Sequence, residues 1–294
     1  MSASTPESLL QQVFGYRDFR WQQKDIIDSA IEGRDALVIM PTGGGKSLCY
    51  QIPALLREGT GLVVSPLIAL MQDQVTALHE LGIEAGFLNS NQSMEEQDVV
   101  RRKLRSGELQ LLYMAPEGLN TERTRALLRE VSLSVIAIDE SHCVSQWGHD
   151  FRHDYLMLGG LKDLFPGVPR LALTATATSR VREEIISRLA LNAPGRFVAP
   201  FDRPNICYHV KPKTDPKRQL LDFLKAHRGE AGIVYCMSRK KTESTAEWLR
   251  DNGFEALPYH AGLDADVRRE HQRRFLADDG VVIVATIAFG MGID

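Results

Sequence analysis

The sequence has few cysteines, no long apolar run and no N-terminal leader, and each of these shortages excludes a class of protein. Its four cysteines lie far apart among the 294 residues, without a C-x-x-C pair, so we expect no zinc site in this chain. Widely spaced cysteines are typical of free thiols in a reducing compartment. A membrane span needs a run of about 18 apolar residues, and the sequence contains none. Because a basic and apolar leader is also missing, we expect a cytoplasmic protein that does not enter a membrane.

The charge of the chain is nearly balanced, with a formal net charge of −3 at pH 7. Such a chain has no overall basic field, so a nucleic acid would have to bind at a local patch. Apolar residues make up 44% and charged residues 25% of the sequence, which is ordinary globular composition. The length is sufficient for two domains.

Short apolar runs alternate with longer amphipathic stretches along the first two thirds of the chain. The expected strands are Ala36–Met40, Gly61–Ser65, Ala85–Leu88, Leu109–Met114, Ser134–Asp139 and Arg170–Thr174, and expected helices include Leu67–Leu81, Glu95–Leu104 and Ser179–Leu189. Continuous apolar strands that alternate with helices indicate a parallel sheet covered on both faces. The predicted fold class is therefore α/β.

The segment Asn192–Pro216 interrupts this pattern with repeated prolines, which is typical of a domain boundary. The alternation then resumes, with expected strands at Gly232–Cys236, Glu255–Pro258 and Val281–Ala285 and expected helices at Lys240–Asn252 and Asp266–Leu276. We predict a first domain over residues 1–199 and a second over residues 200–294. Because the chain stops soon after an expected strand, the second domain is expected to be incomplete, as in a fragment of a longer protein.

A glycine-rich segment between an expected strand and an expected helix predicts a phosphate site. The octet Met40–Ser47 follows the apolar run Ala36–Ile39, and Leu48 can open a helix. Glycines let backbone N–H groups surround phosphate oxygens, and the helix dipole adds positive potential. Lys46 can reach the β- and γ-phosphates, and the Ser47 hydroxyl can bind Mg²⁺. The residues expected to bind the nucleotide here are Thr42, Gly43, Gly44, Gly45, Lys46 and Ser47. The alternative is a plain glycine-rich turn with a solvated lysine.

Two carboxylates follow another apolar run, Val135–Ile138. Asp139 and Glu140 would lie at the carboxyl end of a buried strand, which is where ligands bind in open α/β sheets. Asp139 can hold Mg²⁺ together with Ser47, and Glu140 can polarise or deprotonate an attacking water. The alternative is a solvated cluster at the end of a strand, which the preceding phosphate loop disfavours.

Together these segments resemble the superfamily 2 helicases, and more specifically the RecQ family of DNA helicases. The resemblance rests on Phe14–Gln23, Met40–Ser47, Ser65–Gln74, Ala115–Glu117, Asp139–His142, Ser145–Arg152, Leu173–Thr178, Phe201–Asn205, Tyr235–Arg239, Tyr259–Gly262 and Ala285–Gly292. The aromatic-rich segment Ser145–Arg152 discriminates best, because many NTPases share a phosphate loop. Ser141 departs from the alanine of the family. The resemblance implies two RecA-like P-loop lobes with parallel sheets flanked by helices, the second lobe incomplete.

The resemblance also implies an adenine site near the N-terminus. A flat adenine can stack between Tyr16 and the Arg20 guanidinium, while Gln23 offers an amide to the edge of the base. The alternative, that the aromatic residues of this segment belong to the core, is the better interpretation of Phe14 and Phe19.

Within Asp139–His142, the family motif implies that His142 relays contacts toward Thr174 and Thr176. A lone histidine is more often structural, so this role depends on the motif. The expected catalytic residues are Lys46, Asp139, Glu140 and His142.

Several segments are expected to contact DNA. Trp147 and Phe151 can stack on single-strand bases, and Arg152 can contact phosphate. The alternative is a packed loop in which Trp147 is buried and Arg152 pairs with Asp150. The full expected DNA-binding set is Ser65, Pro66, Leu67, Trp147, His149, Phe151, Arg152, Ser238 and Arg239.

The resemblance implies that the parent protein is an ATP-dependent 3′–5′ DNA helicase that uses Mg²⁺, moves on single-stranded DNA, unwinds duplex DNA, and serves DNA repair and recombination. The related helicases carry an arginine finger beyond the position where this chain stops, so we expect slow hydrolysis and poor unwinding from this chain alone. Two alternatives stay open: a helicase of the same superfamily that acts on RNA, and a nucleotide-gated DNA-binding fragment without turnover. A P-loop kinase is disfavoured, because it would not account for Tyr259–Gly262 and Ala288–Gly292.

Overall fold

The structure, a computed structural model, describes residues 5–66, 68–89, 92–147, 152–200, 206–286 and 289. The chain forms two compact units, and the division between them falls between Arg203 and Pro204. This is a few residues beyond the expected boundary. Each unit is described by itself.

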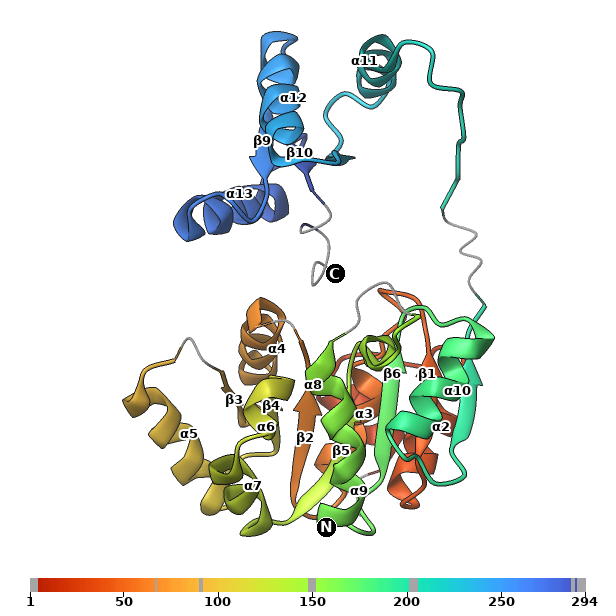
Figure 1. The fold of residues 1–294 in the computed structure, drawn as a ribbon, viewed down its shortest axis with the longest axis vertical. Coiled ribbons are helices and arrows are strands. Elements are labelled where there is room, and N and C mark those ends of the chain that lie inside the picture. The colour runs from red at the N-terminus through yellow and green to blue at the C-terminus, as the bar shows by residue number, and fades with distance from the viewer. Residues whose placement is uncertain are drawn as a thin grey trace. The chain divides into compact units, whose positions relative to one another are not determined.

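The first unit is built on a parallel sheet of seven strands (Figure 1). The strands are β1 (Ala36–Ile39), β2 (Thr60–Val64), β3 (Ala85–Leu88), β4 (Leu111–Met114), β5 (Leu133–Ile138), β6 (Arg170–Thr174) and β7 (Gly195–Val198). Their order across the sheet is β3-β4-β2-β5-β6-β1-β7. All pairs are parallel, so the expected parallel α/β sheet is confirmed, and the carboxyl ends of its strands share one edge.

Strand β7 was not expected, because it lies inside the proline-rich segment interpreted as a domain boundary. It pairs with β1 in parallel, with Ala36 opposite Gly195. The N–H of Ala199 continues this pairing by donating to the carbonyl oxygen of Ile39 at 2.8 Å, and Phe197 packs against the core. Prolines on either side obscure this strand in the sequence, because proline lacks the N–H that a strand interior needs. The strand is recognised in the structure by its pairing with β1.

Helices cover both faces of this sheet (Figure 1). They are α1 (Pro6–Gln12), α2 (Gln23–Ile31), α3 (Leu48–Leu56), α4 (Ile68–Glu80), α5 (Met94–Arg105), α6 (Pro116–Leu119), α7 (Glu122–Arg129), α8 (His153–Leu156), α9 (Leu161–Leu164) and α10 (Ser179–Arg188), with 3-10 turns η1 (Ser141–Val144) and η2 (Met157–Gly160).

Side chains that alternate along each strand divide the core into two layers. On β1, Leu37 and Ile39 pack in the layer formed with α5, α7 and α10, whereas Ala36 and Val38 pack in the layer formed with α2, α3 and α4. Every residue of β1, β2, β4, β5 and β6 is buried. A strand that is apolar on both faces must be covered on both faces, which explains the continuous apolar runs in the sequence.

The second unit has a smaller sheet of three parallel strands in the order β8-β10-β9. Its elements are α11 (Pro216–Ala226), β8 (Gly232–Tyr235), α12 (Arg239–Asp251), β9 (Ala256–Tyr259), α13 (Ala265–Ala277) and β10 (Val282–Ala285). Leu224, Leu249 and Val284 are among the residues that form its core. The unit is again α/β, as the resumed alternation predicted.

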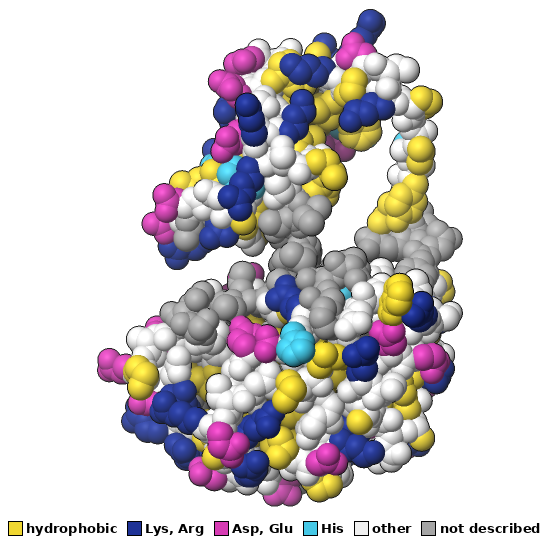
Figure 2. Space-filling model, in the orientation of Figure 1, with side chains coloured by type: hydrophobic (Ala, Val, Ile, Leu, Met, Phe, Trp, Pro, Cys, Tyr) yellow, Lys and Arg dark blue, Asp and Glu magenta, His cyan; other side chains and the backbone are white. Residues whose placement is uncertain are grey.

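Acidic and basic side chains intermingle on the visible face of the first unit (Figure 2). Among the described residues, no helix has both the length and the apolar character needed to cross a membrane.

Candidate nucleotide and nucleic-acid site

The sheet brings three strand ends of the first unit together. The glycine-rich loop follows β1, Asp139 follows β5, and β6 lies between these two strands and ends at Thr174. The Met40 N–H donates to the carbonyl oxygen of Thr174 at 3.1 Å, which ties the start of the loop to the end of β6. Segments that are distant in sequence therefore share one edge, where open α/β sheets bind ligands.

The glycine-rich loop is closed by its own lysine. Gly43 and Gly45 have φ values of 73° and 78°, a backbone region that glycine enters without steric cost. The Lys46 ammonium donates to the carbonyl oxygens of Met40 at 3.1 Å and Pro41 at 3.5 Å. The loop itself therefore holds the ammonium in this structure, and its contact with phosphate stays a prediction. A phosphate group bound in this loop would replace the carbonyl oxygens as the partner of this ammonium.

The Gln23 side chain supports the glycine-rich loop through hydrogen bonds. Its side chain is buried, and its amide nitrogen donates to the carbonyl oxygens of Gly44 at 3.3 Å and Gly45 at 3.0 Å. Its amide oxygen accepts from the Arg20 N–H at 2.7 Å. A Cβ atom on Gly45 would lie 2.4 Å from the Gln23 amide nitrogen, so the contact also requires glycine there. Both polar atoms of the Gln23 amide form hydrogen bonds with protein groups in this structure. The pairing of this amide with adenine stays a prediction.

The other expected adenine residues lie side by side. Tyr16 is half exposed, and the Arg20 guanidinium carbon is 5.9 Å from the centroid of its ring. This spacing leaves both groups available to a flat base, although their role stays a prediction. Phe14 and Phe19 are partly buried against the core, which confirms the structural interpretation favoured for these two rings.

Asp139 and Glu140, two of the four expected catalytic residues, lie on a strained turn. Glu140 has a φ of 46°, a left-handed conformation that costs free energy for any residue but glycine. The turn lets the Glu140 N–H donate to the Asp139 carboxylate at 2.9 Å. Burial, and then the negative charge of Glu140, raise the pKa of Asp139 to about 6, while the Lys46 ammonium opposes that rise. The Asp139 carboxylate therefore lies within the field of the loop lysine.

His142 links the acids to β6. Its Nδ1 lies 2.8 Å from the Thr174 hydroxyl and 3.2 Å from a carboxylate oxygen of Glu140. The Thr174 hydroxyl in turn donates to the carbonyl oxygen of Thr176 at 3.3 Å. The imidazole is buried, so its orientation is set by these groups. The geometry brings together the residues that the relay hypothesis named.

The oxygen groups expected to hold a magnesium ion belong to Ser47 and Asp139, and this role stays a prediction. The phenol of Tyr50 is buried, and its pKa is raised well above the usual value by burial, by Tyr113 and by Asp139, while a hydrogen bond with Ser47 opposes this rise. The Tyr50 phenol therefore lies in the electrostatic field of Asp139. Hydroxyl and carboxylate oxygens are the ligands Mg²⁺ prefers, with phosphates and waters completing the shell. Over the described ranges, no group of three or more His, Cys, Asp or Glu side chains could hold a metal by itself.

Asp139→Asn should stabilise the chain when nucleotide and metal are absent. A carboxyl whose folded pKa of about 6 exceeds the usual 3.8 destabilises the folded state once it ionises. We expect a gain of up to about 3 kcal/mol at pH 7, because one pKa unit corresponds to about 1.4 kcal/mol. The gain should persist above pH 6, shrink as the pH falls from 6 to 4, and vanish below about 3.8, where both the folded and the unfolded forms are protonated. Urea unfolding at several pH values in EDTA measures this. An equal gain at pH 4 and pH 7 would show that ionisation of the buried carboxyl is not the cause.

The expected DNA-binding residues fall into different environments. Trp147 is 62% exposed, so the alternative of a buried tryptophan is wrong. The Arg152 guanidinium donates to the carbonyl oxygen of Pro66 at 3.3 Å, which joins two of the expected segments. Ser65 is buried, so a DNA contact through its side chain stays a prediction. Leu67, His149 and Phe151 lie outside the described residues.

Ser238 and Arg239 lie in the second unit, at the start of α12. The Ser238 hydroxyl caps this helix by accepting from the Lys241 N–H at 3.3 Å. Arg239 is exposed, and its guanidinium lies beside Gly262, where a Cβ atom would be 3.0 Å from it. Their DNA contact stays a prediction.

Two tyrosines of this site were missed in the sequence. The Tyr155 hydroxyl donates to the carbonyl oxygen of Asp139 at 2.9 Å, and the Tyr50 hydroxyl lies 3.4 Å from that of Tyr113. Tyr155 contacts Asp139 from α8, whereas Tyr50 on α3 contacts Tyr113 on β4, and neither stands within a recognisable motif for this role. No local signal would have found them.

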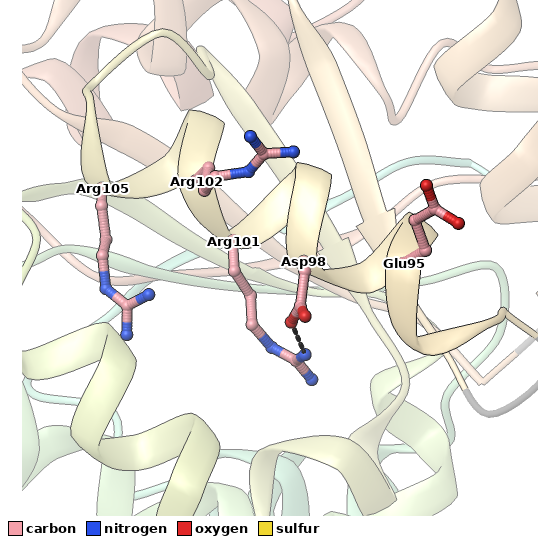
Figure 3. Close-up of a pocket in the computed structure, with 5 residues that line it drawn as sticks. All are labelled: Glu95, Asp98, Arg101, Arg102 and Arg105. Carbon is pink, nitrogen blue, oxygen red and sulfur yellow. Dashed lines mark hydrogen bonds and ion pairs between the residues drawn. The ribbon is translucent and has the colours of Figure 1, made fainter.

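A surface hollow on α5 does not belong to this site (Figure 3). Its lining side chains are Glu95, Asp98, Arg101, Arg102 and Arg105. The Arg101 guanidinium donates to the Asp98 carboxylate at 2.9 Å. Helix α5 packs over β3, the edge strand at the opposite side of the sheet from β1 and β7. This hollow of mixed charge therefore lies away from the glycine-rich loop.

Family models match both halves of the chain. The DEAD/DEAH box helicase model matches residues 20–185, more than half of the chain. The model of the helicase conserved C-terminal domain matches residues 215–294.

Similar proteins include two bacterial DNA helicases. The ATP-dependent DNA helicase RecQ of Pasteurella multocida is 52% identical over 99% of this chain and 46% of its own length. The protein of the same name from Bacillus subtilis is 44% identical over 98% of this chain and 49% of its own length. The chain thus spans about half the length of these relatives.

Solved helicases share the fold at low sequence identity. The DUF1998 helicase MrfA bound to DNA aligns with a TM-score of 0.77 and 19% identity, over all of this chain and 46% of that one. The Mycobacterium smegmatis helicase Lhr, bound to single-stranded DNA and AMP-PNP, aligns with a TM-score of 0.69 and 22% identity, over 98% of this chain and 42% of that one. The two α/β units are RecA-like lobes, the resemblance to RecQ helicases is confirmed, and the chain belongs to the DEAD/DEAH box helicase family.

Proposed function

We propose that this chain is the motor region of an ATP-dependent DNA helicase. The observation that carries the proposal is the meeting of three groups at one sheet edge. Lys46 lies in the electrostatic field of Asp139, and Glu140 is linked through His142 to Thr174 on the strand between them. Coupled ATP hydrolysis requires a lysine, a metal-binding acid and a general base, together with a structural element that connects them to the rest of the protein. In this proposal, β6 is that element.

The chain's own residues divide the work of hydrolysis. Lys46 exchanges its bonds to Met40 and Pro41 for bonds to the terminal phosphates. Ser47 and Asp139 hold Mg²⁺, which supplies charge neutralisation at the phosphates when bound. Glu140 accepts a proton from the attacking water, and its contact with His142 carries the change to β6.

The nucleic acid in this proposal is DNA, with movement 3′ to 5′ on a single strand, unwinding of duplex, and a role in repair and recombination. The names of the relatives support DNA as the substrate. The exposed ring of Trp147 offers a stacking face, and the bond from Arg152 to Pro66 ties its segment to a second expected DNA segment. Ser238 and Arg239 add contacts from the second lobe.

The test is steady-state ATP hydrolysis by this chain without nucleic acid, with single-stranded DNA and with single-stranded RNA. We expect DNA to stimulate the rate more than RNA, because the stacking segment resembles that of a DNA helicase. Greater stimulation by RNA than by DNA would favour an RNA-directed helicase. ATP binding without phosphate release in any condition would favour a nucleotide-gated binding module.

A further inference from the structure

Helix α10 holds the start of the aromatic-rich segment through a closed ring of contacts. The Ser145 hydroxyl donates to the Glu184 carboxylate at 2.7 Å and accepts from the Trp147 N–H at 3.1 Å. The Arg180 guanidinium lies over the Trp147 ring, with its carbon 3.7 Å from the ring centroid. The Arg180 Nε lies 4.0 Å from the other Glu184 oxygen. The ring of contacts thus fixes both the backbone and the indole of Trp147.

The ring of contacts is largely buried at Ser145 and Glu184 and exposed at Trp147. Ser145 is fully buried, and the Glu184 side chain is only 20% exposed. Glu184 also has the Arg188 guanidinium at 3.8 Å. Trp147, in contrast, is 62% exposed although a guanidinium covers one face of its ring. The opposite face is therefore presented to solvent.

Helix α10 is also tied to the nucleotide site. Its cap is Thr178, whose side chain accepts from the Val181 N–H at 3.4 Å. Val181 and Ile185 are buried in the core, so the helix is rigidly seated. A short way before the cap lies Thr174, the partner of His142. Residues 174–184 thus connect the acids, through His142 and Thr174, to Arg180 and Glu184, which hold Trp147.

We propose that Arg180 and Glu184 are positioning residues that orient the Trp147 ring for stacking on a single-strand base. The guanidinium backs one face of the ring, so that a base stacks on the other. A ring held in place before DNA binds loses less conformational freedom on binding. This inference rests on the proposed function, because it requires Trp147 to contact DNA.

The test uses Arg180→Ala in the whole chain and a fluorescein-labelled oligothymidylate, with fluorescence anisotropy as the readout. Loss of an exposed cation–π contact should raise the dissociation constant roughly two- to fivefold. Trp147 emission without DNA, taken as the difference from Trp147→Phe, should also shift. The matched control is Arg196→Ala, which removes a surface arginine paired with Glu183 in the same lobe and should change neither readout.

The double variant Trp147→Ala, Arg180→Ala separates positioning from direct contact. If Arg180 acts through the ring, its loss in the Trp147→Ala background adds no further weakening. A further weakening of the same size would show that Arg180 contacts phosphate itself and would overturn the proposal. Unchanged DNA binding and emission in Arg180→Ala would also overturn it.

The proposed function fails separately, if the unmodified chain does not bind the oligonucleotide or Trp147→Ala binds it equally well. The emission difference, which needs no DNA, then still shows whether Arg180 holds the ring.

Discussion

Lys46→Ala will reduce ATP hydrolysis at least about 100-fold and leave the fold intact. The variant removes the cation that meets the terminal phosphates and the charge that faces Asp139, and loss of one preorganised charged donor costs a factor of this order. The lysine donates to two loop carbonyl oxygens in the unbound chain, so the loss of stability should stay near about 1 kcal/mol. Single-turnover hydrolysis and thermal unfolding measure both effects.

Lys103→Ala is the matched control for this change. Lys103 pairs with Glu84 on the surface at 2.9 Å, with both side chains largely exposed. Its loss should leave both hydrolysis and stability nearly unchanged, because exposed ion pairs contribute little to folding. Hydrolysis at the unmodified rate in Lys46→Ala would show that the glycine-rich loop is not the phosphate site.

Glu140→Gln will reduce hydrolysis about 10²–10⁴-fold while ATP binding is kept. The amide keeps the shape of the side chain but cannot accept the proton of an attacking water. Because the negative charge of Glu140 raises the pKa of Asp139, its removal should also ease ionisation of Asp139 and so favour magnesium binding. Equilibrium binding of a fluorescent ATP analogue, measured beside single-turnover hydrolysis, separates the two steps.

The pair of results distinguishes the two residues. Lys46→Ala should weaken both binding and hydrolysis, whereas Glu140→Gln should weaken hydrolysis alone. Glu122→Gln, which changes an exposed carboxylate paired with Arg129 on α7, serves as the control. Normal hydrolysis in Glu140→Gln would assign the general base to another group, and loss of binding would assign Glu140 a part in holding the nucleotide.

The sequence by itself determined the elements that depend on neighbouring residues. Strands β1, β5 and β6 are continuous apolar runs, and such runs are buried on both faces wherever the chain places them. The glycine-rich loop also follows from local chemistry, because Gly43 and Gly45 permit the turn and β1 and α3 flank it. These features need no knowledge of distant contacts. The resemblance to a helicase family rested on motifs along the sequence, above all the aromatic-rich segment Ser145–Arg152.

The tertiary structure alone decided which distant groups meet. β7 is a strand only because β1 lies beside it, and Gln23 holds the loop carbonyls although its position suggested an adenine contact. The ring from Trp147 through Arg180 to Glu184 joins residues that share no motif. Such contacts depend on the order and register of strands, which arise when many weak local preferences are satisfied together in one packed core. For that reason the sequence determined the chemistry of the site, and only the fold decided how its residues support one another.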